Sequence, residues 1–491
     1  MISFLNMGLQ RNLNRNLNQA TDRIGQALQR LSSGSTLNSP KDGAVAYARV
    51  QDLKSQARGL GQALRNVSDA SGLTKQAESS LSSMLQDVFD LRQIAERAAN
   101  GNISTEERTE LTTEASRILS QLNEYSTSTT YNSFSLLNGS LGTVSVQDGI
   151  SSSSQFSFSI GDARTTVLGR LAILSGSQTG GTTESFNSTN SLVLNGVTIA
   201  GSLDDGVSSS GADGSSLAKV TAINSYTNQT GVYAETLGTI RSLVFSSAGS
   251  TFTGTLASGD FVINGTNITG AVTTTSSLIN VINAATSSTG VIASVDASGY
   301  VQLAASDGRN IQIEISNSSG NAFWDAVNMS TNQSILFTWS TVSSGSLNNT
   351  NVGAVRLYSS KQITVLAGNP ETVGIASGVY NLTSGTAVTS IDLSSVDNAN
   401  QAIKVLNATV TQISALRANV GSVHDRLDSS STKLVRDQEN ALSTAEAIEA
   451  PDVALETVRL VYNQLLQNSS LASLMQANIS AVTVSKLLGN L

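Results

Sequence analysis

The N-terminal stretch of the chain carries a single narrow apolar stripe. From Ile2 to Leu31 an aliphatic residue recurs every three or four positions, with Asn, Gln and Arg between them. This spacing predicts one long amphipathic helix that ends near Gly34. A lone helix with one thin stripe is only marginally stable in water, so the stripe needs a partner. The residues of this stripe that we expect at an interface are Leu5, Leu9, Leu13, Leu17, Ile24 and Leu31.

A second stripe lies at the other end of the chain. Two of the three prolines, Pro40 and Pro451, interrupt the helical pattern at comparable distances from the two termini. Around the first, Ser39 as an N-cap, proline in the first helical position and an acid in the first turn predict the start of a new helix. We infer that residues 1–33 and 452–491 form one unit in which the two stripes match. The C-terminal residues expected at its interface are Val461, Leu465, Met475, Ile479 and Val482.

Between the prolines the apolar spacing tightens to a heptad, which predicts a helical bundle. Steps of four and three run from Leu53 to Ala98, with Thr74 at one seam position. Ser104 opens a capping box, so a second helix runs back from there. Residues 403–434 supply a third seam. At about 1.5–3 kcal/mol for each fully buried aliphatic side chain, three matching seams stabilise helices that none would form alone.

The middle of the chain changes to a strand pattern. Residues 155–160 alternate, with Phe156, Phe158 and Ile160 on one face, and residues 311–315 alternate in the same way. From about residue 170 to 390 the sequence is rich in Ser, Thr, Gly and Asn. Repeated apolar alternation there predicts folded β structure and argues against a linker.

This middle region also contains an internal repeat. Each copy combines an Asn-Gly pair, an Ile-Asn pair and a Thr-Gly-Val segment, which predict a hairpin, a short helix and a returning strand. The Asn of the Ile-Asn pair precedes the Gly of the Thr-Gly-Val segment by seven residues in both copies. The distance from the Asn-Gly pair to the Ile-Asn pair is ten residues longer in the first copy. Two copies are too few for a solenoid. The segments are Asn195–Gly196, Ile223–Asn224 and Thr230–Val232, then Asn264–Gly265, Ile282–Asn283 and Thr289–Val291.

Charge and composition narrow the classes of partner. A net charge of -8 and a pI of about 4.9 argue against nucleic acid or an anionic membrane surface, because both require a basic face. No apolar run is long enough to span a bilayer, so membrane insertion is not expected. The N-terminus lacks the solid apolar core of a secretory signal, so an exported chain would use a route without a cleavable signal peptide.

Little catalytic chemistry is available to this sequence. Cysteine is absent and His424 is the only histidine, which removes most metal and nucleophile schemes. A surface or seam role for His424 is favoured over a catalytic one. No phosphate-binding Gly-Lys-Ser/Thr loop or His-Glu-x-x-His helix occurs. We expect no cofactor, no metal and no enzymatic activity.

Several motifs resemble those of bacterial flagellins. The segments Arg30–Gly34 and Leu37–Asp42 are similar to that family's N-terminal signature, and Leu474–Asn478 is similar to its tail. Residues 130–139 and 416–427 resemble its intermediate landmarks, and the repeat resembles its insert module. The matches cover about residues 1–140 and 395–491 in family order. Pro40, Gly43 and Ala447, which stands where an Arg often precedes Ile448, depart from the usual residues.

The resemblance implies a multidomain α + β structural protein that polymerises into the flagellar filament for motility. It implies a terminal coiled-coil assembly domain (1–33 and 452–491), a helical rod domain with a β-hairpin region (39–168 and 392–450) and an outer, surface-exposed β-rich domain (169–391). Expected partners are further copies of the chain in a helical homopolymer, the flagellar export apparatus and its chaperone, the filament cap and hook-associated proteins. The expected location is the extracellular filament.

Two other functions stay open at this point. The Ser-Pro-x-Asp turn is also similar to the hook-filament junction protein, which would act in few copies, and a secreted adhesive or binding protein is a weaker alternative. Arg92 and, on the next helix, Glu114 resemble the patch that the vertebrate flagellin-sensing Toll-like receptor binds. The family's usual Arg is here Asp90, a charge reversal that should weaken such a contact.

Overall fold

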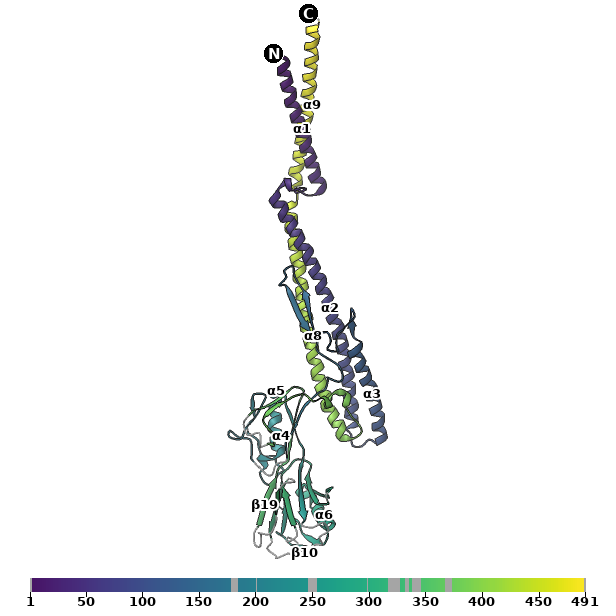
Figure 1. Ribbon diagram of the computed structural model, residues 1–491, viewed down its shortest axis with the longest axis vertical. Coiled ribbons are helices and arrows are strands. Elements are labelled where there is room, and N and C mark those ends of the chain that lie inside the picture. The colour runs from purple at the N-terminus through teal and green to yellow at the C-terminus, as the bar shows by residue number, and fades with distance from the viewer. Residues whose placement is uncertain are drawn as a thin grey trace. The chain divides into compact units, whose positions relative to one another are not determined.

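The structure is a computed structural model that describes residues 2–177, 184–199, 201–245, 254–297, 299–316, 327–331, 335–337, 346–366 and 373–489 (Figure 1). Its helices are α1 (Ile2–Ser33), α2 (Ala44–Ala98), α3 (Thr105–Ser128), α4 (Ser216–Ser225), α5 (Thr227–Thr230), α6 (Thr275–Ala284), α7 (Thr286–Thr289), α8 (Val396–Glu449) and α9 (Val453–Gly489). Short 3-10 turns cover Pro40–Asp42, Ala212–Gly214, Ser384–Thr386 and Val388–Ser390. The long helices lie toward the two chain ends and the strands between them, as predicted.

The strands are short and all described pairings are antiparallel. They are β1 (Thr130–Tyr131), β2 (Phe134–Ser135), β3 (Thr143–Gln147), β4 (Gln155–Ser159), β5 (Ala172–Ser175), β6 (Leu192–Leu194), β7 (Val197–Ile199), β8 (Tyr233–Thr236), β9 (Thr239–Phe245), β10 (Gly254–Leu256), β11 (Phe261–Ile263), β12 (Thr266–Asn267), β13 (Gly270–Val272), β14 (Ile292–Val295), β15 (Val301–Ala305), β16 (Ile311–Ser316), β17 (Val327–Thr331), β18 (Ile335–Phe337), β19 (Ser346–Asn351), β20 (Val355–Ser359), β21 (Ile363–Leu366) and β22 (Gly378–Tyr380).

The chain divides into two compact units. The first comprises residues 1–78, 141–160 and 419–491, and the second comprises residues 79–140 and 161–418. In the first unit α1 packs along α9, and the early part of α2 packs against the late part of α8. The hairpin β3–β4 completes this unit, with Phe156 and Phe158 buried on one face as their alternation predicts.

The predicted helix boundaries are confirmed with one correction. Helix α3 begins at the expected capping box, in which the Ser104 hydroxyl accepts from the amide of Glu107 and the Glu107 carboxylate accepts from the amide of Ser104. The capping box at Ser39 is also present, but it caps only the turn Pro40–Asp42. The expected long helix starts at Ala44, separated from that turn by Gly43, because Gly43 departs from helical geometry.

The second unit contains the two repeat copies, and the second copy is inserted within the first. The first module combines the sheets β5-β20-β8 and β22-β21-β6-β7 with α4 and α5. The chain leaves it after β8 and returns to it at β20. The second module fills that insertion with the sheets β14-β15-β9-β17-β18 and β12-β11-β16-β19 and with α6 and α7. Each module has its own apolar core, and the two described cores share no residue.

Matching hydrogen bonds show that the repeat is structural. Asn195 and Asn264 each donate from Nδ2 to a threonine carbonyl, of Thr230 and Thr289 respectively, both at 2.8 Å. Both asparagines lie in the left-handed region, which suits the turn between two hairpin strands. The predicted hairpin, short helix and returning strand are therefore confirmed in both copies.

Candidate assembly interface

The terminal helices α1 and α9 run side by side in antiparallel directions (Figure 1). On α1 the small residues Ala20 and Ala27 are each 4% exposed. The predicted stripe residues Leu13, Leu17, Ile24 and Leu31 are half-buried around them. Alanine at these positions allows the two helix backbones to approach closely. The predicted pairing of the two chain ends is therefore confirmed, although the side chains of Leu5 and Leu9 lie outside the described residues.

The face that α9 turns toward α1 differs from the predicted one. Glu456 and Asn463 are the buried residues of this face, at 4% and 6% exposed. The half-buried residues that continue it are Leu460, Gln467, Ser470 and Leu474. Steps of four and three separate these positions, so they form a heptad seam that is largely polar. An apolar pattern could not reveal it; the sequence signal was the recurrence of Glu456, Asn463 and Ser470 every seven residues.

The stripe predicted on α9 faces away from α1. Val461, Leu465 and Met475 are 49%, 63% and 68% exposed, so their predicted match with the α1 stripe is wrong within one chain. At 100° per residue, Val461 and Leu465 lie about 140° and 180° around the helix from Glu456, and Met475 lies on the flank at about 100°. Val458, at 65% exposed, extends the same surface. We call Val458, Val461, Leu465 and Met475 the outer α9 face; the side chains of Ile479 and Val482 lie outside the described residues.

Polar contacts set the register between α1 and α9. Arg30 donates from Nη1 to Glu456 Oε1 at 2.8 Å, and Gln467 donates from Nε2 to Thr21 Oγ1 at 3.0 Å. Arg459 approaches the other carboxylate oxygen of Glu456 at 3.5 Å. A buried carboxylate is costly unless it is paired. Arg459 lies on the same helix as Glu456, so it is Arg30 of α1 that favours the one register in which it reaches this carboxylate.

A polar layer interrupts the apolar seam between α2 and α8. Thr74 is 1% exposed and lies 3.3 Å from His424 Nδ1, and its hydroxyl also donates to the carbonyl of Ser71 at 2.9 Å. The Ser71 hydroxyl lies 3.4 Å from the same ring nitrogen, so Nδ1 of His424 has two hydroxyl neighbours in this layer. This arrangement places His424 in the seam, as predicted, and explains the one irregular heptad position.

An open crevice of about 530 Å³ lies between α2, α8 and the tip of the β3–β4 hairpin. Leu60, Ile150, Leu434 and Ala441 form its apolar part, and Asp148, Lys433 and Asp437 are the charged residues of its lining. Lys433 and Asp437 pair with each other on the exposed surface of α8. The crevice therefore offers no concentrated charge of one sign.

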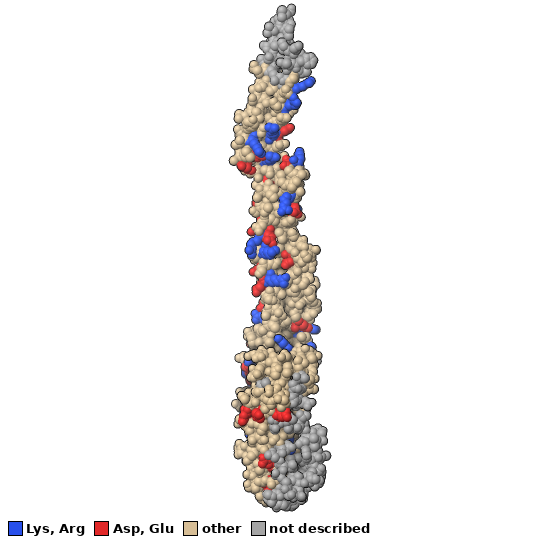
Figure 2. Space-filling view, turned by 90° about the vertical axis from the view of Figure 1, so that its left-hand side faces the viewer, with Lys and Arg blue, Asp and Glu red and all other residues tan. Residues whose placement is uncertain are grey.

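Charged side chains are sparse and mixed in sign on the face that Figure 2 shows. Hydrogen bonds from the Ser104 amide lower the pKa of Glu107, and those from Ser39 lower the pKa of Asp42, so both caps favour the carboxylate form.

Among the described residues, no group of three or more acidic or histidine side chains could hold a metal ion. None of the helices in the part of the chain searched is both long and apolar enough to cross a bilayer.

The residues of the predicted receptor patch lie on two helices of the second unit. Arg92 on α2 donates to Glu96 at 2.9 Å, and both side chains are about half exposed. Asp90 accepts from Gln86 at 3.3 Å, and Glu114 on α3 is exposed. Phe89 adds an exposed aromatic ring, at 43%, that the sequence analysis did not single out.

Family profiles match the two ends of the chain, and two flagellins match most of its length. The profile described as the bacterial flagellin N-terminal helical region matches residues 4–141, and the flagellin C-terminal helical region matches residues 403–488. B-type flagellin of Pseudomonas aeruginosa is 28% identical over 472 residues, covering 95% of this chain and 95% of the relative. Flagellin A of Helicobacter pylori is 26% identical over 507 residues, covering 94% of each.

Among solved structures, the flagellar junction protein FlgL from Legionella pneumophila superposes with a TM-score of 0.32. It is 11% identical, and the match covers 82% of this chain and 99% of that one. A TM-score this low supports neither the filament protein nor the junction protein as the class of this chain.

Proposed function

Because this chain belongs to the bacterial flagellin family, we propose that it enters the flagellar filament through the outer α9 face together with α1. Its role as a filament subunit is a structural one, as it is for the family. The observation that carries the proposal is the exposure of Leu465 and Met475, at 63% and 68%, on a helix whose opposite side is already paired.

Physical chemistry supports assembly at this face. Contiguous exposed aliphatic side chains on a soluble chain mark a surface that another molecule covers. Burying a leucine or valine contributes about 1.5–3 kcal/mol, so four such side chains drive association strongly once many copies stack. When such a face meets a different face of the next copy, the contact is heterologous, and it builds a helical filament if the rotation between copies does not close into a ring.

The remaining family expectations are part of the same proposal. Residues 1–33 and 452–491 form the inner assembly domain, residues 39–168 and 392–450 the rod, and residues 169–391 the outer domain. The chain is exported without a cleavable signal peptide by the flagellar export apparatus with its chaperone. It assembles outside the cell beneath the filament cap, beyond the hook-associated proteins. No cofactor takes part.

The junction-protein alternative has weaker support. Two relatives that match 95% and 94% of the chain are flagellins, whereas the likeness to FlgL is too low in TM-score to weigh. The adhesive alternative requires a ligand site in residues 170–390, and the crevice described above lies in the other unit.

Recognition by the flagellin-sensing Toll-like receptor is a further part of the proposal. Arg92 and Glu114 would supply the contact, and Asp90 would weaken it through its reversed charge. The exposure of Glu114 and the half-exposed guanidinium of Arg92 support an accessible patch in the free chain.

Removal of residues 1–31 tests the assembly role. We expect the truncated chain to stay folded, since α2, α3 and α8 keep their own seams, and to form no filaments under conditions that polymerise the full chain. Circular dichroism measures the first and negative-stain electron microscopy the second. Filaments of ordinary length from the truncated chain would overturn the proposal.

A further inference from the structure

The two repeat copies differ by one insertion, and its position in the fold is informative. Sixteen residues lie between Ile199 at the end of β7 and Ser216 at the start of α4. In the second copy only six lie between the equivalent Ile268 and Thr275. The ten additional residues fall within residues 201–215, which we call the clamp loop.

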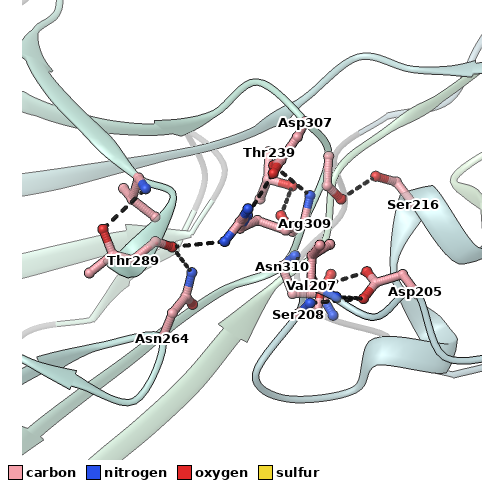
Figure 3. A network of polar contacts seen from close by, with 12 residues as sticks. Asp205, Val207, Ser208, Ser216, Thr239, Asn264, Thr289, Asp307, Arg309 and Asn310 are labelled. Carbon is pink, nitrogen blue, oxygen red and sulfur yellow. Dashed lines mark hydrogen bonds and ion pairs between the residues drawn. The ribbon is translucent and has the colours of Figure 1, made fainter. Parts of the chain in front are cut away.

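The clamp loop binds a turn of the second module through Asn310 (Figure 3). The side-chain Nδ2 of Asn310 donates to the carbonyls of Ser210 and Gly211, both at 2.9 Å. Its backbone amide donates to Ser208 Oγ at 2.9 Å. Asn310 is 1% exposed, so these hydrogen bonds form away from solvent and each is costly to lose.

The loop is held in shape for this contact by Asp205. The Asp205 carboxylate accepts from the amides of Val207 and Ser208, at 2.9 and 2.8 Å, and from the Ser208 hydroxyl at 2.7 Å. Ser208 therefore gives its hydrogen to Asp205 and presents a lone pair to the Asn310 amide. The chain of donors runs in one direction, from the second module into the loop of the first.

A second set of hydrogen bonds fastens the same turn. Ser216, the first residue of α4, donates from Oγ to the carbonyl of Gly308 at 2.8 Å. Thr239, just past the crossing, donates from Oγ1 to the carbonyl of Arg309 at 2.6 Å. Gly308 has a φ of +81°, and a Cβ there would lie 2.2 Å from Thr236 Oγ1, so only glycine allows this approach.

Two longer hydrogen bonds also join the modules: Ser209 donates from Oγ to Gln312 Oε1 at 3.2 Å, and Thr350 donates from Oγ1 to Ser210 Oγ at 3.5 Å. The chain crosses between the modules twice, and Leu237 donates from its amide to the carbonyl of Ala354 at 3.0 Å where the crossings meet. Gly238 and Gly353 flank this point. Two glycine-containing crossings between separate cores would form a hinge if nothing else joined the modules.

We propose that the clamp loop locks this hinge, so that the inserted second module keeps one orientation on the first and the two move as a single unit. Asn310 is the positioning residue of the lock, and the ten-residue insertion in the first copy exists to reach it. This role is independent of filament assembly, because all the contacts lie within one chain.

The absence of cysteine makes the test direct. Cysteines at Val379 in the first module and Val295 in the second, 56% and 54% exposed, accept spin labels whose separation pulsed electron resonance measures. In the otherwise unchanged chain we expect one narrow distance distribution. Asn310→Asp keeps the shape but turns a donor toward two carbonyl oxygens as an acceptor, and we expect the narrow peak to be lost.

Asn187→Asp is the matched control. Asn187 Oδ1 only accepts, from the amides of Thr189 and Asn190 at 2.8 Å, and a carboxylate keeps that role. We expect its distance distribution to equal that of the unchanged chain. Ser208→Ala provides a milder variant if Asn310→Asp does not fold, as circular dichroism would reveal. A broad distance distribution in the unchanged chain would overturn the proposal. So would a narrow distribution in folded Asn310→Asp, or in Ser208→Ala if Asn310→Asp does not fold.

Discussion

Arg30 and Glu456 lie 426 residues apart in the sequence and form a 2.8 Å ion pair between α1 and α9. The Glu456 side chain is 5% exposed and that of Arg30 is 26% exposed. This ion pair therefore links α1 to α9 at a buried position in the seam between them, where few of the described apolar side chains are buried.

Arg30→Ala should destabilise the α1–α9 pair by about 1–2 kcal/mol, because it removes a charge-assisted hydrogen bond while Arg459 still partly compensates Glu456. Hydrogen exchange of the α1 amides measures the change. Arg23→Ala, at an exposed position of the same helix, is the control and should have little effect. Equal exchange in the two variants would show that the ion pair does not stabilise the helices.

Arg108→Ala should destabilise the turn between α2 and α3. The Arg108 guanidinium is buried and donates to the carbonyls of Ala98 and Asn100, both at 2.8 Å, and so caps the C-terminus of α2. Its removal leaves these carbonyls poorly satisfied, at a cost of about 2–4 kcal/mol in the free energy of unfolding. Urea denaturation measures it, with the exposed Glu110→Ala as the control. A loss no larger than in the control would contradict the capping role.

Acid should weaken the clamp loop. Burial alone would raise the pKa of Asp205, but hydrogen bonds from Ser215, Ser208 and the Val207 amide outweigh it and hold the pKa below its ordinary value. A carboxyl with a lowered folded pKa stabilises the fold above its unfolded pKa, and this contribution is lost as the pH falls through the folded value. Thermal unfolding should show wild type above Asp205→Asn at neutral pH, with the gap closing below about pH 3.9. A gap independent of pH would exclude the carboxylate.

Asp90→Arg should raise signalling through the flagellin-sensing Toll-like receptor, because it restores the charge that the family usually carries beside Arg92. A reporter-cell assay with the monomer measures the potency. Asp425→Arg, an exposed acid on α8, reverses an equal charge elsewhere and should change nothing. Equal potency of all three proteins would remove the charge argument.

The helical part of the fold could be predicted because its signals are local and periodic. Heptads, capping boxes and prolines defined α2, α3 and α8 closely, and the irregular Thr74 is explained by its contacts with His424 and the Ser71 carbonyl. The helix start predicted at Ser39 begins only the turn Pro40–Asp42, because the backbone of Gly43 departs from helical geometry, and no spacing pattern specifies that departure.

Two features could not be predicted, for different physical reasons. The nesting of one module in the other depends on strand pairing between distant segments such as β8 and β20, which local hairpin signals do not specify. The orientation of α9 depended on polar residues, Glu456 and Asn463, occupying the buried side. A search for apolar stripes selects the opposite side, which here is the exposed one.

Electron microscopy of Leu465→Glu filaments tests the central claim most directly. Leu465 is 63% exposed in the free chain, so a charge there should leave the monomer folded while preventing burial of the outer α9 face in the polymer. Leu465→Met keeps the side chain apolar and similar in volume, and should polymerise normally. We predict long filaments from Leu465→Met and none from Leu465→Glu under the same conditions. Filaments of ordinary length from Leu465→Glu would contradict assembly through this face.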